Sequence, residues 1–206
     1  MRDKHIEVGR VQGWVEIIVR DKHGNIKYHI GSPPTKHPIK EDESTAPTHP
    51  PKEEPCSGEG CAIASSLPGK LIDLHYWRKN VITDVGLACM IRLIFSGLTE
   101  DKFGYIAIGT GTTAESTTDT ALEAEIARKA ATVSQTTTSV SGDTALLEAT
   151  FSSADGLTGT SNVSETGIFN ASTGGDMLAR KTFSAVPLDW DAGDSLTIRY
   201  YVQMSR

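Results

Sequence analysis

The last third of the sequence repeats one pattern, in which short apolar or β-branched segments alternate with turn signals. Residues 195–204, SLTIRYYVQM, show it best, because side chains on alternate positions are apolar along the whole segment. Earlier segments of this kind lie at 132–140, 145–151, 163–170 and 177–183. Short strands joined by turns, without alternating helices, are typical of antiparallel sheets. The sequence therefore predicts a mainly β protein, an antiparallel β-sandwich of the jelly-roll-like type.

A β-hairpin is predicted near the N-terminus, at residues 11–30. Its first arm alternates from Trp14 to Arg20, and its second arm covers residues 26–30. Between the arms, DKHGN supplies the glycine that a short hairpin turn requires. A further strand is expected at 70–79, so we expect the hairpin to belong to the main sheet.

The most apolar run of the chain, residues 80–95, predicts a single helix over 83–96. Thr83 or Asp84 supplies an N-cap oxygen, and Gly97 follows where a C-cap is expected. Apolar side chains occupy two faces, one with Val85, Cys89 and Leu93 and another with Leu87, Ile91, Ile94 and Phe95. A helix that is apolar nearly all round is expected to be buried. We therefore predict a buried central helix, too short to span a bilayer, and no membrane partner.

Residues 31–69 form a proline-rich insertion that holds eight of the nine prolines and few large apolar side chains. Such a segment cannot offset its own ordering entropy, so we expect an extended arm that orders against neighbours. The predicted organisation is 1–30, 31–69 and 70–206. The prolines assigned to the interaction arm are Pro33, Pro34, Pro38, Pro50, Pro51 and Pro55.

Cys56 and Cys61 flank SGEG within this insertion. Their spacing allows a small disulfide ring, and His49 nearby makes a metal site the alternative. A zinc site requires about four ligands, and the usual CxxC pair is missing. The shortage of ligands favours a disulfide or free thiols, and we expect neither a bound metal nor a cofactor.

The glycine-rich stretch at 109–113, GTGTT, follows an apolar segment at 103–108. A phosphate-cradling loop requires a Lys-Ser/Thr pair before a helix, and no lysine follows until Lys129. A turn is the favoured interpretation. The segment 121–129, ALEAEIARK, is either one or two helical turns or an extended stretch.

Enzyme and nucleic-acid functions find little support in the sequence. The formal net charge is −6, whereas binding to phosphate backbones requires a basic surface. No GxSxG elbow occurs, and the histidines at 5, 23, 29 and 75 have no recognisable nucleophile partner. Glu123 and Glu125 would point apart on a helix and are expected to be solvated. We predict no catalytic residue and no direct contact with nucleic acid.

Aromatic side chains offer a carbohydrate- or receptor-binding alternative, carried by Trp77, Trp190 and Tyr201, with Tyr200 beside them. The competing interpretation is that these rings fill the sandwich core and a subunit contact, and we favour it.

Three segments together carry a resemblance to a known group: GWVEIIVRDKHGNI, then NVITDVGLACMIRLI with YIAIGTGTTAESTTDTALEAEIARK, and finally SETGIFNASTGGDMLARKTFSAVPLDWDAGDSLTIRYYV. This pattern resembles small structural proteins of tailed phages and related viruses, of the tail-fibre, minor tail or head-decoration type. It covers residues 11–30 and 76–206, and the proline-rich insertion departs from it.

The resemblance implies a non-enzymatic building block assembled in many copies on a virion, as a capsid decoration or head fibre. The alternative is a tail-fibre or baseplate protein that binds a carbohydrate or receptor. Expected partners are other copies of the chain, most plausibly as a trimer, and virion proteins such as the major capsid or tail proteins. The N-terminus, MRDKHIEVGR, lacks an apolar signal region, so we expect synthesis in the host cytoplasm and a final location in the virion.

Overall fold

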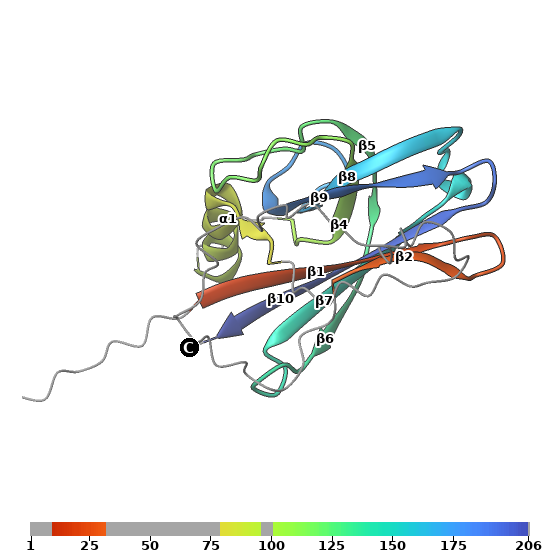
Figure 1. The fold of residues 1–206 in the computed structure, drawn as a ribbon. Coiled ribbons are helices and arrows are strands. Elements are labelled where there is room, and N and C mark those ends of the chain that lie inside the picture. Colours follow the sequence, from red (N-terminus) through yellow and green to blue (C-terminus); the bar gives the residue numbers. More distant parts are fainter. Residues whose placement is uncertain (1–9, 32–78, 96–100, 206) are drawn as a thin grey trace, which may run out of the picture.

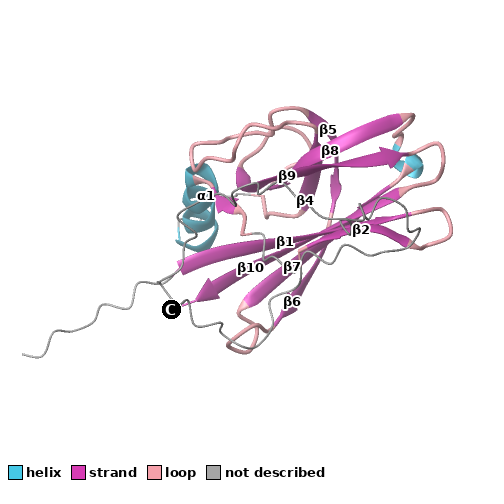
Figure 2. Cartoon of the chain, viewed as in Figure 1, coloured by secondary structure: helices cyan, strands magenta, loops and turns pink. Residues whose placement is uncertain are grey.

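The computed structural model describes residues 10–31, 79–95 and 101–205, and within them two five-stranded sheets face each other. Figures 1 and 2 show the two layers, with one α-helix at one end of them. All strand pairs are antiparallel. The predicted antiparallel β-sandwich with one helix is confirmed.

The first sheet has the order β2-β1-β10-β7-β6. Its strands are β1 (Arg10–Arg20), β2 (Ile26–Ile30), β6 (Thr132–Thr136), β7 (Thr144–Phe151) and β10 (Ser195–Ser205). Strand β1, the first arm of the N-terminal hairpin, pairs with β10 along its whole length, from Arg10 opposite Ser205 to Arg20 opposite Ser195. The two ends of the described chain are thereby joined in one sheet.

The second sheet has the order β3-β9-β8-β4-β5. Its strands are β3 (Val81–Ile82), β4 (Tyr105–Gly109), β5 (Glu125–Ala130), β8 (Thr160–Phe169) and β9 (Met177–Asp189). The stretch at 121–129, for which the sequence left two alternatives, is extended and becomes the edge strand β5. Strand β9 runs six residues past the predicted end at 183 and includes Pro187, which lies opposite Asn162.

The core lies between the sheets and is built from the alternating positions of both. Val15, Ile17 and Val19 of β1 are at most 1% exposed, as are Ile106 and Ile108 of β4. Because side chains on one face of a strand recur every second residue, the period-2 pattern places these residues together. The two sheets bury each other's inner faces, and Met90 of the helix packs against the same core.

On the outer face of the first sheet, a row of polar side-chain contacts crosses four strands. Glu16 of β1 contacts His29 of β2 at 2.7 Å and Arg199 of β10 at 3.3 Å, and Arg199 also pairs with Glu148 of β7. Opposite charges on neighbouring strands favour this register over a slipped one.

The predicted buried central helix is wrong in its position. Helix α1 (Asp84–Phe95) stands at one end of the sandwich and packs against β9 (Figure 1). Only Gly86 and Cys89 of its residues are buried. An apolar composition nearly all round predicts burial of most of the helix surface, but Leu87, Ile91, Ile94 and Phe95 are exposed among the described residues.

The proline-rich insertion lies outside the described residues, as do Cys56, Cys61, Trp77 and the strand expected at 70–78. Its two attachment points are described, however. The backbone of Gly31 approaches the carbonyl of Val15, and Lys79 bridges Trp14. The described chain therefore leaves the sandwich at Gly31 and continues in it at Lys79, next to neighbouring residues of β1.

Candidate interaction site

Helix α1 is fixed to the sandwich at its N-terminus. Thr83 is the N-cap, since its Oγ1 accepts a hydrogen bond from the Gly86 amide at 3.1 Å. The Thr83 amide also donates to the Leu178 carbonyl of β9 at 2.9 Å. A Cβ on Gly86 would lie 2.5 Å from Leu178 Cα, so only glycine permits this close contact of helix and strand.

The opposite face of α1 is an exposed apolar stripe. It consists of Leu87, Ile91, Ile94 and Phe95, with exposed fractions of 41%, 58%, 56% and 76%. Their spacing of four, three and one residues places them along one side of the helix. Arg92 is the one basic residue of α1, and it pairs with Asp176 at 2.6 Å. The stripe itself therefore carries no charge.

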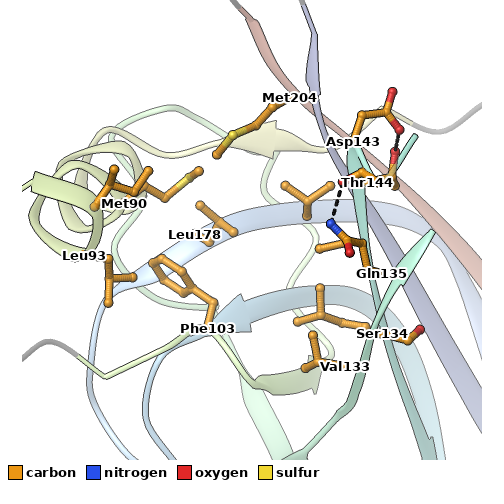
Figure 3. Close-up of a pocket in the computed structure, with 15 residues that line it drawn as sticks. Met90, Leu93, Phe103, Val133, Ser134, Gln135, Asp143, Thr144, Leu178 and Met204 are labelled. Atoms are coloured by element: carbon orange, nitrogen blue, oxygen red, sulfur yellow. Dashed lines mark hydrogen bonds between the residues drawn. The ribbon is translucent and has the colours of Figure 1, made fainter. Parts of the chain in front are cut away.

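A cavity of about 570 Å³ opens beside this helix, between α1 and the first sheet. Met90 and Leu93 of α1 face Val133 of β6 and Met204 of β10 across it, with Phe103 and Leu178 at its base (Figure 3). Most of its lining is apolar. Val133 and Met204 are themselves about half exposed, at 52% and 51%. The cavity thus continues the apolar stripe of the helix onto the sheet.

A polar turn at 137–143 forms the rim of the cavity and is ordered by Asp143. The Asp143 carboxylate accepts hydrogen bonds from the amides of Thr138, Ser139 and Val140, and from Gln203 Nε2. Desolvation would raise the pKa of Asp143, but these hydrogen bonds outweigh it and hold the pKa well below its usual range. The carboxylate is thus satisfied by its own turn.

We call the exposed apolar side chains around the cavity the apolar end. They are Leu87, Ile91, Ile94, Phe95, Val133, Val140 and Met204. Ile94, Val133 and Met204 line the cavity directly, and the backbone amide of Met204 donates to Asp143 in the turn that carries Val140. Seven of the ten large apolar side chains exposed in the described part of the chain gather here.

A second cluster, of charged side chains, is buried in the second sheet. Glu165 is fully buried, and its carboxylate accepts two hydrogen bonds from Arg180, at 3.1 and 2.8 Å. Arg180 also donates to Asp119 at 2.8 Å. Burial would lower the pKa of Arg180, but its hydrogen bonds to Asp119 and Glu165 raise it above the ordinary value. Arg180 therefore keeps its positive charge inside the protein.

The glycine-rich loop binds this cluster rather than a phosphate. The amides of Gly111, Glu123 and Ala124 donate to the Glu165 carboxylate, at 3.0, 3.1 and 2.7 Å. The amides of Thr112 and Thr113 donate to Glu123 instead. The backbone amides that would have to bind a phosphate thus donate to carboxylates of the protein instead. This arrangement agrees with the interpretation of the stretch as a turn.

Five donors surround the Glu165 carboxylate, so its lone pairs are already occupied. Sequence reasoning did not identify Glu165, Arg180 or Asp119, because nothing in their spacing distinguishes a buried ion pair from solvated charges. No group of three or more potential metal ligands occurs within the described ranges. Across the same ranges, no helix combines the length and apolar character needed to cross a membrane.

The aromatic residues predicted as contacts are placed as follows. Trp190 is 1% exposed and its Nε1 donates to Ser161 Oγ at 3.0 Å, so its ring belongs to the core. Tyr200 and Tyr201 are also buried. Trp190 and Tyr200 belong to the core between the sheets, whereas Tyr201 is buried on the outer face of the first sheet, opposite Trp14. Trp77 and the proline-rich arm lie outside the described residues, and the contact roles of these residues stay predictions.

A comparison with protein families identifies the group to which these elements belong. The model of the family described as podophage GP4 fiber I protein gp80 matches residues 97–201, just over half of the chain. The chain belongs to this family. The match covers β4 to β9 and most of β10, and thus includes the buried charged cluster and, of the apolar end, Val133 and Val140. No curated protein and no solved structure matches the chain.

Membership of this fibre-protein family makes the chain a structural component of a phage virion, where it associates with other virion components. The resemblance noted in the sequence is confirmed at this level. Helix α1 and the N-terminal hairpin precede the matched residues. The apolar end therefore combines a surface of the family domain with a helix outside the match.

Proposed function

We propose that this chain is a non-enzymatic building block carried in multiple copies on the surface of the particle, as a capsid decoration protein or head fibre. The observation that carries the proposal is the apolar end. Monomeric proteins rarely expose contiguous apolar surface above a few hundred Å². Such a surface is expected in an assembly protein, because a neighbouring subunit covers it in the particle.

The buried charged cluster supports a structural role for the second sheet. Arg180, Glu165 and the amides of the glycine-rich loop satisfy one another inside the protein. Their arrangement stabilises a long loop against the sheet and offers no accessible acid or base. The alternative function, carbohydrate or receptor binding on a tail fibre, has no support from Trp190 or Tyr201, since both are buried.

Immunogold labelling of purified virions tests the proposal. Antibodies against this chain are expected to label the capsid surface at several positions on each particle. Label confined to the tail would overturn the decoration proposal in favour of the tail-fibre alternative. Particles without label, prepared from lysates that contain the chain, would contradict a virion role altogether.

A further inference from the structure

We propose that the apolar end is the surface through which copies of this chain bind one another, with α1 helices packed side by side around the axis of a cyclic oligomer. This inference rests on the proposed function, since it names the partner of the surface described above.

The first argument is the area. The seven side chains of the apolar end are between 41% and 76% exposed. At ~150–250 Å² for a large side chain, they leave on the order of 700 Å² open. A stable specific interface buries about 800 Å² on each partner. The apolar end is therefore close to the size of one complete interface and larger than a surface normally left in water.

The second argument is the charge. The chain carries a formal net charge of −6, so two copies repel each other unless they meet at an uncharged face. The apolar stripe of α1 has no charged member, and the neighbouring Asp143 is directed into its own turn. Asp84, an exposed residue in the first turn, lies seven residues before Ile91 and therefore on the same side of the helix. The later turns of α1, from Leu87 to Phe95, present no carboxylate, and copies of the chain can meet there.

The third argument is the spacing of the stripe. Leu87, Ile91 and Ile94 follow one another at four and three residues, which is the spacing of a coiled-coil seam. A coiled-coil seam has two alternating positions, and Ile91 and Ile94 occupy one of each. Isoleucine at both positions favours bundles of three or four helices over dimers. A trimer around α1 agrees with both this preference and the oligomer expected from the sequence.

The experiment compares the wild-type chain with Ile91→Glu in sedimentation equilibrium. Ile91 is 58% exposed, so the folded monomer tolerates the change, whereas an oligomer would bury the new charge between helices. We expect the wild-type chain to form an oligomer and Ile91→Glu to associate at least tenfold more weakly. Leu87→Glu, on the same stripe, is expected to behave alike.

Ile126→Glu provides the matched control, because Ile126 is an exposed isoleucine of β5 outside the apolar end. Its self-association should equal that of the wild-type chain. Thermal unfolding followed by circular dichroism shows whether each variant folds.

Three results would overturn the inference. An oligomer unaffected by Ile91→Glu would place the interface elsewhere. A wild-type monomer whose incorporation into particles is lost in Ile91→Glu would assign the surface to a different virion protein. A wild-type monomer strongly destabilised by Ile91→Glu would mean that another part of the same chain covers the helix. Particle labelling is measured separately, so failure of self-association leaves the proposed virion role standing.

Discussion

Glu165 shows how much a single residue can determine in this fold. It is fully buried in β8 and connects Arg180 of β9 with three amides of the loop before β5. The sequence does not predict that Glu165 is buried, because the surrounding segment has only the features of an ordinary strand. Only the packing of three separate segments gives it a role.

Glu165→Gln should destabilise the protein by about 3–5 kcal/mol, since it leaves Arg180 buried without its main counter-charge. Urea unfolding at neutral pH measures the change. Glu148→Gln is the control, because its pair with Arg199 is more than a third exposed on the Glu148 side, and it should cost at most about 1 kcal/mol. Equal losses in the two variants would contradict a structural role for the buried cluster.

The pKa of Asp143 makes a prediction about acid stability. This pKa is lowered in the folded chain, so its contribution to stability is complete above the unfolded value of about 4 and is lost as the pH falls below it. Asp143→Asn should therefore be less stable than the wild-type chain at pH 7, and the gap should narrow toward pH 3. Unfolding midpoints at both pH values test this.

Asp191→Asn, in an exposed turn position, is the control for Asp143. The gap between this variant and the wild-type chain should change much less between the two pH values. A gap for Asp143→Asn that is independent of pH would show that its carboxylate does not order the turn.

At the scale of elements, strands were predicted more accurately than the helix environment. Period-2 alternation identifies β1 and β10 because their inner faces are buried by the opposite sheet, whereas β7 and β8 are predicted from the turn signals around them. Residues 121–129, ALEAEIARK, are ambiguous because they include good helix formers, and the strand at 125–130 forms by pairing with β4. For α1 the sequence predicts two apolar faces. It does not determine whether each face is covered by another part of the same chain or by a neighbouring protein.

Gly86→Ala tests the contact that holds α1 in place. Alanine normally stabilises a helix by up to about 1 kcal/mol relative to glycine. Here the added Cβ would meet Leu178 Cα at 2.5 Å and push the helix from β9, so we expect a loss of about 1–3 kcal/mol instead. Differential scanning calorimetry measures the sign directly.

Gly104→Ala is the matched control for this substitution, because the nearest atom to its Cβ is 3.8 Å away, an ordinary contact. Its stability should remain within about 0.5 kcal/mol of the wild-type chain. If Gly86→Ala were as harmless as Gly104→Ala, the close packing of helix and strand would be wrong.

For the whole molecule, the sandwich class followed from the sequence, whereas the pairing of the first strand with the last did not. Local turns predict hairpins such as β1–β2 and β6–β7, but nothing local places β1 beside β10. The same holds for the candidate interaction site, which brings together α1, β6 and the end of β10. Its residues are individually unremarkable apolar positions, and only the tertiary arrangement makes them one surface.

The last prediction concerns the proline-rich arm, whose attachment points adjoin each other on β1, at Val15 and Trp14. Deleting residues 33–55 removes about half of the connection between them. Halving a loop changes its closure free energy by only about 0.6 kcal/mol, so the sandwich should fold as before and melt within a few degrees of the full chain.

We expect the deletion to weaken binding to particles or to sister subunits, because an arm of this composition orders only against neighbours. Binding of the shortened and full-length proteins to particles that lack the chain measures the difference. Unchanged binding would show that the arm is a tolerated insertion, and it would leave the apolar end as the surface on which assembly depends.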